Sequence, residues 1–144
     1  MKTITPSPGD IKRALYVIDA SGQALGRLSS QVAAILRGKN KPYYSPNLDT
    51  GDYVIVVNAE KVRITGTKMK NKVYEEYSGC PGGLKEVPIA DVLAKHPDRI
   101  IRHAVRGMLP KTILGKDMLK KLLVYAGPGH KHAAQKPIEL TLKY

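Results

Sequence analysis

Tyr16-Val17-Ile18-Asp19-Ala20-Ser21-Gly22 begins the part of the chain that decides the fold, because its β-branched residues predict a strand that runs into a glycine turn. Apolar residues then recur every three or four positions, which predicts a helix over about 24–37 that ends at Gly38. The continuously apolar run Tyr53-Val54-Ile55-Val56-Val57 is typical of a strand buried on both faces. Because the linker is long enough for a right-handed crossover, these segments predict a parallel β-α-β unit.

The rest of the chain continues to alternate between strands and helices. Its patterning predicts a short strand over 62–65, a hairpin tip or charged loop over 68–72, a β-type run over 73–77, helices over about 89–95, 97–107 and 113–121, and a last strand over 122–125. We find no internal repeat and no interdomain linker. Residues 1–144 therefore predict one α/β domain, with irregular basic segments as an N-terminal arm (1–13) and a C-terminal extension (127–144).

The chain is strongly basic, and the charge is uneven. Its 144 residues include 24 Lys or Arg and 12 Asp or Glu, which gives a formal net charge of +12. Residues 1–60 hold 7 basic and 5 acidic residues, whereas residues 61–144 hold 17 and 7. A polyanionic partner is therefore expected, mainly against the second half. The apolar content of 42% is a globular value and argues against wholesale disorder.

Cysteine content and hydropathy exclude several other classes of protein. The single cysteine, Cys80, excludes an internal disulfide framework and a cysteine-cluster zinc site, and nothing in its glycine-rich loop marks an activated thiol. No apolar run reaches the roughly 20 residues of a membrane span, and the N-terminal residues lack a signal-peptide core. We therefore expect a soluble cytoplasmic protein with no membrane partner.

Positive charge is densest between Arg99 and Lys121, where seven Lys or Arg and His103 accompany a single acid, Asp117. Steps of three and four residues place cations on one helix face and apolar residues on the other. The cationic face comprises Arg99, Arg102, His103 and Arg106, and the apolar face comprises Ile101, Ala104, Val105 and Met108. A solvated basic face is the ordinary alternative, but acids are scarce in this half of the chain, which favours binding to phosphates.

A second group of cations, Lys68, Lys70 and Lys72, precedes Tyr74 and Tyr77. Tyrosine can stack on an unpaired base, so this segment is a candidate RNA contact. Half-buried cross-strand packing of the tyrosines explains the pattern equally well. The acids Glu75 and Glu76 stay unassigned, either facing a basic protein neighbour or only interrupting the run of positive charge.

A nucleotide-binding enzyme is the main alternative that the β-α-β pattern raises. However, Gly22 and Gly26 are four residues apart, and neither GxGxxG nor GxxxxGK[ST] is present. We interpret Gly22 as a turn residue and Gly26 as a position of close helix packing. The sequence His130-Lys131-His132 lacks a supporting carboxylate, and no Ser/His/Asp group has motif spacing. We therefore expect no catalysis, metal, cofactor or small-molecule substrate.

Four segments together resemble the L-thirteen protein family of the large ribosomal subunit in its bacterial form. They are Tyr16-Val17-Ile18-Asp19-Ala20 with Leu25-Gly26-Arg27-Leu28; Asn47-Leu48-Asp49-Thr50-Gly51-Asp52-Tyr53; Ala104-Val105-Arg106-Gly107-Met108-Leu109-Pro110-Lys111; and Leu123-Val124-Tyr125-Ala126-Gly127 with His130-Lys131-His132-Ala133-Ala134-Gln135. The resemblance covers essentially the whole chain in order. Cys80 departs from it, because tyrosine or histidine is expected there, so no stacking role is carried over to that position.

The resemblance implies a three-layer α/β/α domain with a small, mainly parallel sheet. It also implies that the protein is built into the large subunit against ribosomal RNA and neighbouring ribosomal proteins, takes part in early subunit assembly, and has no catalytic residues. We therefore predict a non-enzymatic structural constituent of the ribosome that recognises RNA through phosphate and shape. The alternatives are a free-standing regulator that binds messenger RNA and an α/β nucleotide-utilising enzyme. The expected RNA-binding residues are Lys68, Lys70, Lys72, Arg99, Arg102, Arg106, Lys111, Lys116, Lys120, Lys121, His130, Lys131, His132 and Gln135.

Overall fold

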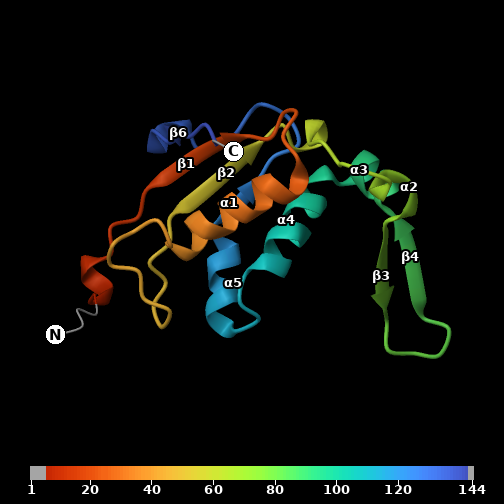
Figure 1. Cartoon of the computed structure of the whole chain (residues 1–144), viewed down its shortest axis with the longest axis horizontal. Coiled ribbons are helices and arrows are strands. Elements are labelled where there is room, and N and C mark those ends of the chain that lie inside the picture. Colours follow the sequence, from red (N-terminus) through yellow and green to blue (C-terminus); the bar gives the residue numbers. More distant parts are fainter. Residues whose placement is uncertain (1–5, 143–144) are drawn as a thin grey trace.

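The computed structural model describes residues 6–142, and its centre is a parallel four-stranded sheet (Figure 1). The strands are β1 (Leu15–Asp19), β2 (Tyr53–Val57), β5 (Leu122–Val124) and β6 (Ile138–Glu139), arranged in the order β5-β2-β1-β6. All three strand pairs are parallel. The predicted β-α-β unit and the α/β class are therefore confirmed.

Helix α1 (Leu25–Arg37) connects β1 to β2 and ends where the sequence predicts. Its C-cap, Gly38, has φ = 79°, and its N–H donates to the carbonyl oxygens of Ala34 and Ile35. This left-handed conformation favours glycine, and a side chain there would also stand 2.8 Å from the carbonyl carbon of Thr50. The expected packing role of Gly26 is wrong, because Gly26 is exposed and a Cβ atom there would contact nothing within 4 Å.

The core lies between the sheet and the helices α1, α4 (Pro97–Met108) and α5 (Ile113–Lys120). One continuous cluster of buried side chains joins these helices to one another and to alternate residues of β1 and β2. Its members include Ile18, Leu28, Val32, Leu36, Val54, Val56, Ile101, Val105 and Met118. Each such burial stabilises the fold by roughly 1.5–3 kcal/mol. The connection from β5 to β6 carries only the 3₁₀ helix η3 (Ala133–Gln135).

A second sheet, the hairpin of β3 (Val73–Tyr77) and β4 (Leu84–Pro88), projects from this body (Figure 1). Helix α2 (Lys68–Asn71) precedes it and α3 (Ile89–Lys95) follows it. Both alternatives for 68–72, a hairpin tip or a charged loop, are wrong, because residues 68–71 form α2 and the tip of the hairpin lies at 78–83. The predicted strand over 62–65 is also wrong. After η2 (Ala59–Lys61), only Arg63 makes an isolated bridge, to Ala24.

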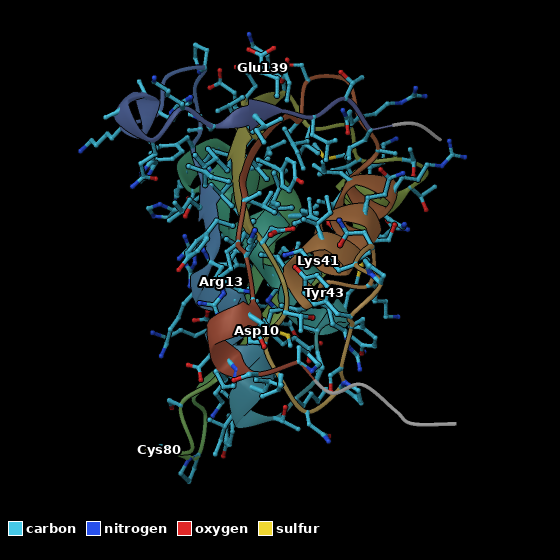
Figure 2. The ribbon with its side chains drawn as sticks, turned by 90° about the vertical axis from the view of Figure 1, so that its left-hand side faces the viewer. Asp10, Arg13, Lys41, Tyr43, Cys80 and Glu139 are labelled. Carbon is cyan, nitrogen blue, oxygen red and sulfur yellow. The ribbon has the colours of Figure 1, made fainter. Side chains whose placement is uncertain are left out.

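Both terminal segments contact the body. Residues 1–5 and 143–144, which belong to the expected arms, lie outside the described residues. The rest of the N-terminal segment includes η1 (Pro8–Asp10), and Lys41 donates to the carbonyl oxygen of Lys12 at 2.7 Å beside Arg13 and Tyr43 (Figure 2). The C-terminal segment was expected to be irregular, but it adds β6 to the edge of β1.

Candidate nucleic-acid interface

Helix α4 has the two faces that the spacing predicts. Pro97 occupies its first turn, where a missing N–H costs nothing, and Asp98 follows it. Ile100, Ile101 and Val105 are buried against the body. The cations on the opposite face, Arg99, Arg102, His103 and Arg106, are all exposed. Met108 was predicted on the apolar face, but it is 46% exposed because α4 ends there and the chain turns away.

The turn between α4 and α5 holds the two helices in a fixed geometry. Leu109 is buried, and Thr112 caps α5 by accepting a hydrogen bond from the backbone N–H of Gly115 at 3.4 Å. Gly115 itself packs so tightly that a Cβ atom would overlap the carbonyl oxygen of Pro110. This close approach places the exposed residues Lys111 and Lys116 beside the cations of α4.

An open pocket of about 310 Å³ lies where these cations meet. Arg106, Lys111 and Lys116 line it together with His103, and Leu109, Pro110 and Leu119 supply apolar surface. Among the described residues that line the pocket, none is acidic. Three cations around an apolar floor suit a ligand that carries phosphate beside a ribose or base. We call Arg106, Lys111 and Lys116 the pocket cations.

Lys120 and Lys121 are neighbours in sequence with different surroundings. Lys120 is 77% exposed and forms an ion pair with Asp117 at 2.8 Å on the same helix. Lys121 is 5% exposed, and its ammonium group pairs with Asp49 and donates to the carbonyl oxygen of Leu36 at 3.2 Å. Burial lowers the pKa of Lys121, and the hydrogen bond and charge of Asp49 oppose that shift. The assignment of Lys121 as a phosphate contact is therefore corrected to a structural role.

Lysines in α2 and at its C-cap lie at the surface, and Tyr74 links one of them, Lys72, to α4. Lys68, Lys70 and Lys72 are exposed, and the ammonium group of Lys72 lies 5.3 Å from the centre of the Tyr74 ring. Tyr74 in turn meets His103 edge-on, with ring centres 4.9 Å apart. Tyr74 is half-buried, and this burial raises the pKa of its hydroxyl. Of the two alternatives for the tyrosines, half-buried packing is therefore the one that Tyr74 shows.

The candidate residues of the C-terminal extension form a separate group. The hydroxyl of Tyr125 and Nε2 of His132 are 2.9 Å apart, and the rings of His130 and His132 stack with centres 6.4 Å apart. Lys131 and Gln135 are exposed. Within residues 6–142, no group of three or more His, Cys, Asp or Glu side chains could hold a metal ion.

The sequence did not point to a further hollow where the C-terminal half of α1 meets the end of α4. Arg37 and Lys39, at the end of α1, line it together with Met108. The sequence carries no signal for these two cations, because the first sixty residues have little net charge and only the packing of α1 on α4 brings them near the second half of the chain.

Comparisons with known proteins are consistent over nearly the whole chain. The family model described as Ribosomal protein L13 matches residues 13–131. The large ribosomal subunit protein uL13 of Pseudomonas entomophila (strain L48) is 54% identical over 142 residues, which cover 99% of this chain and 100% of that protein. The protein of the same name from Agathobacter rectalis is 58% identical over 137 residues, covering 95% of this chain and 96% of the relative. That from Thermobifida fusca is also 58% identical, over 96% of this chain and 93% of the relative.

These matches agree with the resemblance that the four sequence segments carry. No helix in the described part of the chain is long and apolar enough to cross a membrane. A family match over residues 13–131 and relatives of 54–58% identity along nearly their full length leave one conclusion: the chain belongs to the ribosomal protein L13 family.

Proposed function

We propose that this protein is a structural constituent of the large ribosomal subunit and binds ribosomal RNA through the surface of α4 and α5. Full-length relatives that carry the name large ribosomal subunit protein uL13 support the first part. The pocket between α4 and α5 is the single observation that carries the second part, because its cations have no acidic neighbour among the residues that line it. In this proposal the protein acts in the cytoplasm, supports early subunit assembly and catalyses no reaction.

The chemistry of the surface favours recognition of phosphate and shape. Each neutralised phosphate releases counterions, so a protein with a net charge of +12 gains affinity from every contact its cations make. The deep major groove of an RNA helix hides its base edges from side chains. The contacts proposed are therefore Arg99, Arg102, Lys120, the pocket cations, Lys68 and Lys70 of α2 with Lys72 after it, and His130, Lys131, His132 and Gln135 in the C-terminal extension.

A triple variant of the pocket, Arg106→Ala, Lys111→Ala and Lys116→Ala, tests this surface. We expect the slope of log K against log salt for binding to large-subunit RNA to become shallower by about 2–3, since each lost phosphate contact removes about 0.7–0.9. The measurement is incorporation of labelled protein into reconstituted large subunits over a series of salt concentrations.

The matched control removes the same charge elsewhere on the surface. Lys12, Lys61 and Lys95 are exposed and lie outside the α4–α5 pocket. Their triple alanine variant is expected to change the slope by less than half as much as the pocket variant. Equal slopes for the pocket variant and the unaltered protein would contradict the proposed surface, and equal losses in the two variants would reduce it to an effect of net charge.

A further inference from the structure

The β3–β4 hairpin has two faces with different surroundings. In an antiparallel pair, residues directly opposite each other point to the same side, so the register of β3 and β4 assigns every side chain to a face. On the inner face, Tyr74 contacts His103, and Glu76 pairs with Arg99 at 3.2 Å. This face therefore packs toward α4, and its carboxylate is already opposed by a cation.

The other face, which we call the outer hairpin face, has no such cover. It consists of Val73, Glu75 and Tyr77 on β3 and of Leu84, Glu86 and Pro88 on β4. Tyr77 is 66% exposed and Leu84 is 54% exposed, and these two residues lie opposite each other. Val73, 40% exposed, faces Pro88 at the other end. Apolar side chains therefore occupy both ends of a solvent-facing surface.

Between the apolar ends, two carboxylates oppose each other. Glu75 lies directly opposite Glu86, and neither forms an ion pair with any residue in the part of the chain that the structure describes. Like charges in directly opposite positions destabilise an antiparallel pair. A two-stranded hairpin is also only marginally stable in water by itself. The isolated hairpin thus lacks a group that would neutralise these carboxylates and cover its apolar ends.

The charge of the hairpin is opposite to that of the chain. Residues 73–88 contain three Glu and one Lys, within a protein whose net charge is +12. The six residues of the outer hairpin face include two acids and no cation. An RNA phosphate would be repelled there, whereas a basic peptide would be attracted.

We propose that the outer hairpin face is a docking surface for a basic segment of a neighbouring protein. A Lys or Arg side chain of that segment pairs with Glu75 and Glu86, and its apolar residues cover Tyr77 with Leu84 and Val73 with Pro88. The hairpin therefore contacts protein, while α4 and α5 face RNA. We expect this neighbouring protein in the large ribosomal subunit, and in this the inference rests on the proposed function.

Cys80 provides a site-specific probe for this proposal. It is the only cysteine of the chain, it is exposed, and it lies in the loop at the tip of the hairpin (Figure 2). A benzophenone maleimide attached to Cys80 is carried into reconstituted large subunits and activated by light. We expect a cross-link to another protein, with the attachment mapped by mass spectrometry to a Lys/Arg-rich segment.

The same reagent separates this inference from the proposed function. A Cys80→Ser, Lys116→Cys variant carries the probe into the α4–α5 pocket, where we expect cross-links to RNA. A protein cross-link from Cys80 without an RNA cross-link from position 116 would leave the docking surface standing and contradict the RNA surface. A cross-link from Cys80 to RNA or to a second copy of this chain, or the lack of any product, would overturn the docking surface.

A charge reversal tests the role of the carboxylates. In Glu75→Lys the new ammonium group faces Glu86, so the hairpin gains a favourable cross-strand pair while its outer face loses its negative charge. We expect the yield of the protein cross-link from Cys80 to fall about tenfold. Glu60→Lys makes the same change at another exposed position, on η2, and is expected to leave the yield unchanged. Equal yields from the two variants would contradict the proposal.

Discussion

Replacing Gly115 by alanine is expected to lower the free energy of unfolding by about 3 kcal/mol or more, because the new methyl group would overlap backbone atoms. A Cβ atom at this position would stand 2.8 Å from the carbonyl carbon of Pro110 and closer still to its oxygen. Neither atom can move as a flexible side chain would, since Pro110 lies in the short turn that joins α4 to α5. The clash must therefore push the two helices apart.

Gly107→Ala is the matched control, because Gly107 is also helical and lies on the other side of the same turn. A Cβ atom there would meet nothing within 4 Å. Alanine is favoured over glycine inside a helix, so this variant is expected to gain up to about 1 kcal/mol. Urea denaturation followed by circular dichroism measures both variants. A Gly115→Ala protein as stable as the Gly107→Ala protein would show that the close approach at the turn is not needed.

Much of the α/β body could be predicted because its signals are local and repeated. The apolar positions of α1 recur at helical spacing, and Gly38 ends the helix through its own backbone conformation. By contrast, the sequence gives no local signal for the strands β4 and β6. All five residues of β4 are exposed, so burial imposes no alternation on it, and β6 is a two-residue strand whose partner β1 lies more than a hundred positions away.

The candidate site also has one part that the sequence predicts and one part that depends on long-range packing. The cationic face of α4 follows from helical spacing alone, and the structure agrees with it. The pocket does not follow from spacing, because it depends on how the turn after Met108 sets α5 against α4. The hairpin contact between Glu76 and Arg99 depends on strand pairing that the sequence does not reveal. Long-range pairing, more than local propensity, decides which charges are left without partners.

Lys121 is a cation whose long-range partner the sequence does not reveal. Its replacement by methionine is expected to cause the second large loss of stability. The change leaves the carboxylate of Asp49 and the carbonyl oxygen of Leu36 without the ammonium group that binds them both. Removing one partner of a buried ion pair typically costs about 3–5 kcal/mol. We expect a loss near the lower value, about 3 kcal/mol, since Asp49 also accepts from the backbone N–H of Gly51. Urea denaturation measures this loss in the free energy of unfolding.

Lys120→Met is the neighbouring control, because this exposed ion pair with Asp117 is worth less than about 1 kcal/mol. Burial lowers the pKa of Lys121 in spite of Asp49, which indicates that the pair only partly offsets the cost of burying the ammonium group. Removing both charges in Lys121→Met, Asp49→Asn should therefore recover about 1–2 kcal/mol of the loss. A double variant no more stable than Lys121→Met would contradict this coupling. We expect a folded Lys121→Met protein to keep the salt slope of RNA binding, whereas the pocket variants flatten it, because the ammonium group of Lys121 is buried and already bonded to Asp49 and Leu36.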